Sequence, residues 1–239
     1  MSKDPTEELV NALVEQLPIQ KAYDDGLSAS VEEAGGALTD IIKTLRLALA
    51  PVQYAAALQD RYRAFLDKSV RRIPSENRTQ PPPQILGPVI EGIRYEPAGT
   101  PIDEMFSQLL SRSMDSHRAN EAHPSFPHII RQLSADEAKI LERLNKTSFP
   151  FVYTKDWDPA SKTFSNQQIE QDGLPRTNLS FPDNIQFYFD HLNALGLAGI
   201  YEVRNQEPII ERGKQTGTRA FFEYQLSPLG QRFVSACGE

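Results

Sequence analysis

The stretch that decides the fold of the second half of the chain is residues 134–145, with the sequence SADEAKILERLN. Ser134 and Glu137 have the spacing of a capping box, in which the two residues each satisfy a backbone N–H group of the other at the start of a helix. The apolar residues that follow recur at helical spacing: Ala138, Ile140, Leu141 and Leu144. We therefore expect a helix over residues 134–145.

Downstream of this helix, the patterns predict a small mixed region. Apolar or aromatic side chains occupy every second position of residues 220–226, which is typical of a strand. We expect, in order, a short strand over 149–153, a long polar loop over 154–180, a helix over 181–195, strands over 200–203 and 220–226, and a last helix from residue 227. This is the order of a winged-helix domain with a small antiparallel β-wing.

Upstream, the sequence is helical in character. Residues 28–50 have an amphipathic pattern, Pro51 ends or kinks that helix, and a second amphipathic stretch runs to about residue 72. We expect these two helices to form an antiparallel hairpin. A Pro-rich connector follows at about 74–101, in which we expect an extended stretch at residues 81–83 and a short helix around residues 88–95. Pro101 is well placed to begin another helix. The expected fold is thus mainly α, of the α+β type, with a helical domain over 1–133 and a winged-helix-like domain over 134–239.

The composition excludes several classes of protein. Of the 239 residues, 39% are hydrophobic and 24% charged, and the net charge is −7, which disfavours a general binder of nucleic acid. The longest stretch without a charged residue, Leu47–Gln59, is too short to span a membrane. The first residues lack the apolar core of a secretory signal, and the one cysteine, Cys237, excludes an internal disulfide. We expect a cytoplasmic location and leave open a peripheral association with the inner membrane.

No catalytic, cofactor-binding or metal-binding motif is present in the sequence. It contains no nucleophile elbow, phosphate-binding loop or dinucleotide fingerprint. His117, His123 and His128 lie close together, but their spacing matches no zinc motif, and we interpret them as structural. We expect no catalysis, no cofactor and no metal.

Nucleic-acid binding is an alternative carried by three cations. Arg212, Lys214 and Arg219 surround the tip of the expected wing and are weak candidates for phosphate contacts. The expected recognition helix, however, has no Lys or Arg between Arg176 and Arg204. We therefore expect no nucleic-acid partner and favour a protein-binding or structural winged helix.

Membrane binding is a further alternative. The stretch from Leu38 to Leu58 is amphipathic, rich in alanine and low in charge, and an amphipathic helix that exposes its apolar face can lie in a membrane interface. A toxic effector would then act through the helices of residues 28–72. The competing interpretation is that the apolar stripe is the core of the hairpin.

Several motifs resemble the abortive infection alpha family. The central motif runs from Ala122-His123-Pro124-Ser125-Phe126 through Ile129-Ile130 to residues 132–141. Similar motifs lie upstream and downstream: Met105-Phe106, Leu109-Leu110, Ser113-Met114-Asp115, Ala48–Pro51, the Pro82–Pro88 block, His191–Leu197 and Leu226–Phe233.

The resemblance implies a bacterial or prophage protein of phage resistance and brings no catalytic residues with it. It points to Met114, Asp115, His123, Pro124 and Phe126 as motif or interaction residues. We expect a phage or host protein as the partner, with a homo-oligomer left open. In this hypothesis the helical part acts or is released, the winged-helix-like part holds it or senses a phage component, and the turn of residues 123–126 joins the two.

Overall fold

A computed structural model describes residues 58–238, and the expected helix of residues 28–50 lies outside these. The chain forms two compact units, one ending at Pro127 and the other beginning at His128. From the sequence we placed the division after residue 133, and the turn of residues 123–126 lies at the end of the first unit. Each unit has its own buried apolar residues.

The first unit is helical. Residues 58–71 form a helix, followed by α4 (Pro83–Ile93), α5 (Pro101–Ser113) and the short α6 (Phe126–Ile130), which spans the division. The helix expected from Pro101 is present, with the Thr100 hydroxyl accepting the N–H of Asp103 at 3.1 Å. The core of this unit comprises Phe65, Leu66, Val70, Val89, Ile93, Leu109 and Leu110.

The short helix expected around residues 88–95 of the Pro-rich connector is present as α4, but it begins earlier, at Pro83, and ends at Ile93. Pro82 is extended, but Pro83 is the first residue of the helix, where its missing N–H costs no hydrogen bond. Five apolar residues of α4 are buried, because one face of the helix packs into the core. Residues 83–93 are therefore part of the core rather than a spacer.

Polar contacts also join the helix of residues 58–71 to α5. Asp103 is buried and binds the side chains of Arg61 and Lys68. Burial raises the pKa of Asp103, but the Gly99 N–H and the Arg61 guanidinium outweigh it, so the pKa lies below its usual value. The hydroxyls of Ser69 and Ser107 lie 3.0 Å apart, and these small side chains let the two helices approach closely.

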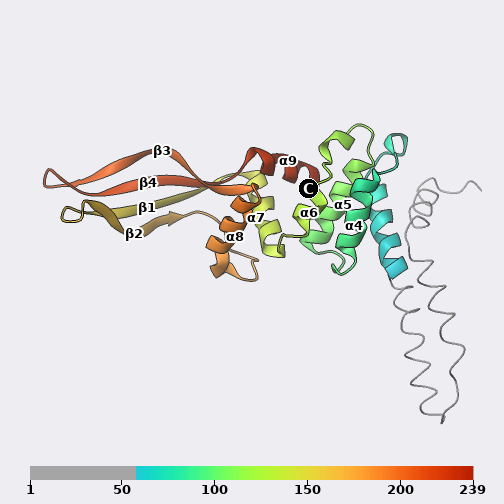
Figure 1. The fold of residues 1–239 in the computed structure, drawn as a ribbon, viewed down its shortest axis with the longest axis horizontal. Coiled ribbons are helices and arrows are strands. Elements are labelled where there is room, and N and C mark those ends of the chain that lie inside the picture. The colour runs from blue at the N-terminus through green and yellow to red at the C-terminus, as the bar shows by residue number, and fades with distance from the viewer. Residues whose placement is uncertain (1–57, 239) are drawn as a thin grey trace, which may run out of the picture. The chain divides into compact units, whose positions relative to one another are not determined.

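The second unit alternates helices with two β-hairpins (Figure 1). Its elements are α7 (Ala135–Lys146), β1 (Phe149–Asp158), β2 (Thr163–Asp172), α8 (Ile185–Ala194), β3 (Ala198–Glu211), β4 (Lys214–Leu226) and α9 (Pro228–Cys237). All strand pairs are antiparallel, in the order β2-β1-β4-β3. The α+β class is confirmed, and the capping box of Ser134 and Glu137 begins α7 as expected.

The sheet is larger than the sequence patterns predicted. The loop expected over residues 154–180 is wrong, because it contains the end of β1 and all of β2. The expected strand over 200–203 is the start of the much longer β3. No apolar alternation marks β2, since its residues are exposed on both faces and it is stabilised by pairing along β1.

Among the described residues of the second unit, helices cover one end of this sheet. In Figure 1, α7, α8 and α9 gather at the end where β1 begins and β4 ends. Phe189 of α8 packs there on Tyr224, with ring centroids 4.5 Å apart. The remainder, residues 153–169 and 202–222, is called the distal sheet below.

Side chains of the distal sheet pack mainly on one another. Tyr153 stacks on Phe222 at 5.4 Å between ring centroids, Trp157 contacts Phe164, and the Arg204 guanidinium lies over the Phe221 ring. The β3–β4 connection is a two-residue turn with positive φ at Arg212 (51°) and Gly213 (77°). These angles define a type I′ turn, whose twist matches that of the strands.

Candidate interaction surface

Two adjacent carboxylates at the start of α7 organise the surface around α8. Glu137 completes the capping box by accepting the N–H of Ser134 at 2.7 Å. Its other carboxylate oxygen lies 2.6 Å from Nδ1 of His191, on α8. The Glu137 side chain is buried, so it links the start of α7 to the end of α8.

Asp136 holds the loop that leads into α8. Its carboxylate accepts the N–H groups of Ser180 and Phe181, each at 2.9 Å, and the hydroxyl of Tyr188 at 3.0 Å. Burial raises the pKa of Asp136, but these three hydrogen bonds outweigh it and lower the pKa to about 2. The carboxylate is therefore ionised at neutral pH and fixes the backbone at Phe181.

Two phenylalanines of this region face solvent, one in the loop that Asp136 holds and one on α8. Phe181 is 64% exposed and Phe187 is 65% exposed. Phe187 stacks on His191, with ring centroids 6.4 Å apart and planes inclined by 18°. Large exposed aromatic side chains on an ordered backbone are typical anchors of protein interfaces.

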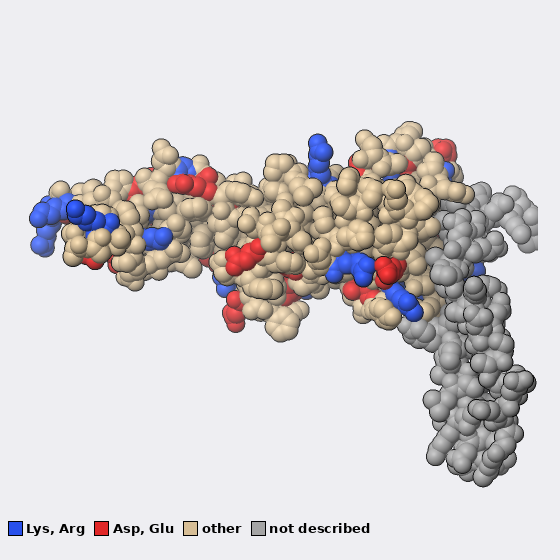
Figure 2. Space-filling view, in the orientation of Figure 1, with Lys and Arg blue, Asp and Glu red and all other residues tan. Residues whose placement is uncertain are grey.

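Acidic side chains flank the two phenylalanines. Asp183 lies in the turn before α8, and Asp190 is three residues after Phe187 and thus on the same helix face. Both aspartates are exposed, and within residues 58–238 no ion pair involves either. Figure 2 shows Asp and Glu side chains over the region of α8. We call Phe181, Asp183, Phe187 and Asp190 the α8 surface.

The apolar pattern of α8 contained a signal for this surface. Ile185, Tyr188, Phe189 and Leu192 follow helical spacing and are buried. Phe187 does not fit that stripe, and an aromatic residue off the buried face of an amphipathic helix is a candidate contact residue. Phe181 had no comparable signal, because its exposure depends on the hydrogen bond from its N–H to Asp136.

The three cations predicted at the wing tip separate into two groups. Arg219 is bound by both carboxylate oxygens of Glu170, at 2.7 and 2.9 Å, so its charge is compensated. Arg212 and Lys214 lie at the β3–β4 turn. Lys162, in the β1–β2 turn at the same end of the sheet, was missed because that hairpin was expected to be a loop.

The motif residues lie in the first unit, away from the α8 surface in the chain. Met114 and Phe126 are buried. The Asp115 carboxylate accepts the N–H of His117 at 3.0 Å, and Nδ1 of His123 accepts the N–H of Ser125 at 3.1 Å. Pro124 lies in the turn that begins with His123. These contacts are local and shape the turns on either side of residues 119–121.

The exposed His123 and Ser125 do not form a typical nucleophile and base pair. Nδ1 of His123 lies 2.7 Å from the Ser125 hydroxyl, but the same nitrogen accepts the Ser125 backbone N–H. Within the described residues, no group of three or more His, Cys, Asp or Glu side chains is placed to hold a metal ion.

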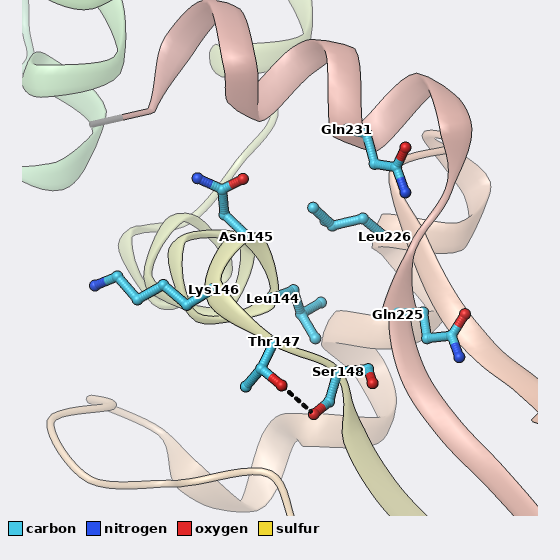
Figure 3. A pocket seen from close by; sticks show the side chains of 8 residues that line it. All are labelled: Leu144, Asn145, Lys146, Thr147, Ser148, Gln225, Leu226 and Gln231. Atoms are coloured by element: carbon cyan, nitrogen blue, oxygen red, sulfur yellow. Dashed lines mark hydrogen bonds between the residues drawn. The ribbon is translucent and has the colours of Figure 1, made fainter.

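An open pocket of about 470 Å³ lies between the end of α7, the end of β4 and the start of α9 (Figure 3). Its walls are mostly polar: Leu144, Asn145, Lys146, Thr147, Ser148, Gln225, Leu226 and Gln231. Two of the polar side chains have partners of their own, since the Ser148 hydroxyl donates to Glu223 and the Lys146 ammonium binds Glu142. The lining contains no histidine, and Glu223, whose carboxylate accepts from Ser148, is not one of the lining residues.

The alternative of a membrane-acting hairpin falls partly outside the structure. Over residues 58–71, the apolar stripe is buried in the first unit, with Phe65, Leu66 and Val70 covered. In the part of the chain that the structure describes, no helix combines the length and apolar character needed to cross a membrane.

One comparison with known proteins gives a match. The model of a protein family described as abortive infection alpha matches residues 53–237. No curated protein and no solved structure matches the chain. The match covers every helix and strand described above.

Proposed function

Because the chain belongs to the abortive infection alpha family, we propose that it is a phage-defence protein that binds another protein through the α8 surface, in the bacterial cytoplasm and without catalysis. The family supports a role in abortive infection. The observation that supports the mode of action is the exposure of Phe181 and Phe187 on a backbone clamped by Asp136.

The physical chemistry of the α8 surface favours a protein partner over nucleic acid. Asp183 and Asp190 would repel phosphate groups, and nucleic-acid readers need cations to neutralise them. Aromatic anchors whose backbone is already ordered lose little conformational freedom on binding, which favours affinity for a protein. A partner with an apolar and basic contact region fits this surface.

The topology supports a winged-helix-like second unit. Within the sheet, β1 pairs with β4 and β4 pairs with β3, and α8 directly precedes the β3–β4 wing. In this interpretation β2 is an added edge strand, and α8 takes the position of the recognition helix. That helix carries aspartates and phenylalanines where a DNA reader carries basic and amide side chains.

Phage challenge of bacteria that carry the gene tests the proposal. The double variant Phe181→Ala with Phe187→Ala should lose protection, with plaque counts returning to those of cells without the gene. Tyr95→Ala is the matched control, because Tyr95 is 77% exposed and lies in the other unit. Equal amounts of the variants in cells should be checked by immunoblot.

The infected-cell survival in the same assay separates the alternatives. Protection accompanied by death of infected cells supports abortive infection, whereas protection with survival contradicts it. Full protection by the Phe181 and Phe187 double variant would refute the role of the α8 surface. Loss of protection in the Tyr95 control would mean that removing any exposed aromatic side chain impairs defence, which would contradict a specific role of the α8 surface.

A further inference from the structure

The end of the sheet opposite the helices carries a compact positive surface. We call Lys162, Ile210, Arg212 and Lys214 the sheet tip: Lys162 lies in the β1–β2 turn and the others in or beside the β3–β4 turn. Figure 2 shows Lys and Arg side chains gathered at this end. Within residues 58–238, no ion pair involves these three cations.

An exposed apolar side chain lies among these cations. Ile210 is 56% exposed and sits two residues before Arg212. Glu211 borders one turn and Asp158 the other, so two acidic side chains stand against the three cations and the tip keeps a net positive charge. The tip thus has an apolar anchor surrounded by cations, whereas the α8 surface has apolar anchors flanked by acids.

We propose that the sheet tip of one copy docks on the α8 surface of a second copy, so that the chain assembles head to tail. This inference rests on the proposed function, because it names the partner of the α8 surface. Arg212 and Lys214 face Asp183 and Asp190 in the contact, and Ile210 packs between Phe181 and Phe187. Opposite charges that surround an apolar anchor provide steering as well as specificity.

The two surfaces of one copy cannot meet. α8 packs where β4 ends, at Tyr224, and the tip lies where β4 begins. At roughly 3.3 Å per residue, the stretch of β4 from Lys214 to Tyr224 separates them by about 33 Å. Because the two surfaces differ, each copy offers one of each, and the contact propagates into a ring or an open chain.

Other occupants fit the tip less well. A long polyanion that contacted the tip would also meet the exposed Glu202 farther along β3, where Arg204 is already paired with Glu207. Tyr153 stacks on Phe222 and has the Lys155 ammonium 5.2 Å from its ring centroid. Its ring is therefore engaged by neighbours rather than displayed for stacking with a base.

Sedimentation velocity of the purified full chain tests the self-association. Larger species should form with rising concentration at about 0.05 M salt and dissociate at about 0.5 M salt, because salt screens the exposed charges. Reversal of the tip (Arg212→Glu with Lys214→Glu) or of the α8 surface (Asp183→Lys with Asp190→Lys) should each weaken the association by about tenfold or more.

Mixing the two reversed variants gives the decisive result. Each alone presents like charges at every contact, but in the mixture each tip meets an α8 surface of opposite charge. Assembly should therefore return on mixing, which a misfolded variant would not do. The control exchanges the exposed pair of α7, Glu142→Lys with Lys146→Glu, and should assemble like the unmodified chain.

The outcomes separate this inference from the proposed function. An unmodified chain that stays monomeric at every concentration and salt overturns the inference, as does assembly that survives both reversals. Binding of the tip to DNA or anionic vesicles by a monomeric chain would also overturn it. If the chain stays monomeric but the Phe181 and Phe187 double variant loses protection, the proposed function stands with another protein as partner. Charge-dependent assembly in a chain whose double variant still protects supports the inference and refutes the defence role of the α8 surface.

Discussion

The helices of the first unit and the distal sheet of the second differ in how far they bury their apolar side chains. In the helices, Leu66, Ile93 and Leu109 have no exposed surface. In the distal sheet, Phe164 and Ile210 remain exposed, and the aromatic contacts run between neighbouring strands. The difference indicates that stability is concentrated in the helical cores, whereas the sheet and α8 leave apolar side chains available for partners.

The two units also differ in what their buried carboxylates stabilise. Asp103 joins two helices through Arg61 and Lys68 and lies inside the first unit. Asp136 instead binds backbone N–H groups of a loop and thereby holds the exposed Phe181 in place. One carboxylate stabilises packing, and the other also supports a surface.

Phe126→Ala should have the largest effect on stability. The Phe126 side chain is 3% exposed, and removal of a buried phenylalanine costs about 3–5 kcal/mol because it leaves a cavity. Urea denaturation followed by circular dichroism measures the change. Phe187→Ala is the matched control, and we expect it to stay within about 0.5 kcal/mol of the unmodified chain. Equal losses of unfolding free energy in the two variants would contradict the assignment of Phe126 to the core and Phe187 to the surface.

Acidification should remove the contribution of Asp136. Its pKa is about 2 in the folded chain and 3.8 ordinarily, so it stabilises the fold by about 2 kcal/mol at neutral pH. Because the folded pKa is the lower one, this contribution is complete above pH 3.8 and is lost as the pH falls through 2. Unfolding free energies measured from neutral pH downward should fall less steeply in Asp136→Asn. If the unfolding free energy of Asp136→Asn depends on pH in the same way as that of the unmodified chain, the ionised Asp136 carboxylate does not contribute this stability.

Phe164→Ala should have a smaller effect than the loss of Phe126 or of the Asp136 charge. Phe164 is half-exposed and contacts Trp157 at 4.9 Å between ring centroids, and such an aromatic pair contributes about 1 kcal/mol. Urea denaturation should show this small loss, and hydrogen exchange should show faster exchange confined to β1 and β2. A loss above about 3 kcal/mol would place Phe164 in a cooperative core and contradict the comparison.

Local sequence signals predicted most helices, the first part of β1 and parts of β3 and β4. The capping box of Ser134 and Glu137, and Pro101 at a helix start, act through neighbouring backbone groups and can therefore be recognised without a fold. The strand β2 could not be recognised, since its polar residues form a strand only because β1 lies beside them. The second half of α4 was expected from the sequence, but its start at Pro83 was not, because the prolines there favour an extended connector and only packing of the apolar face outweighs that preference.

The candidate site divides in the same way. The sequence by itself determined the acidic, cation-free character of α8, the family motifs and the cations at the β3–β4 turn. The tertiary structure alone decided that Glu170 neutralises Arg219, that Lys162 joins the sheet tip and that Asp136 presents Phe181 to solvent. Charge and local spacing are properties of the residues, whereas pairing and exposure depend on which distant segments the fold brings together.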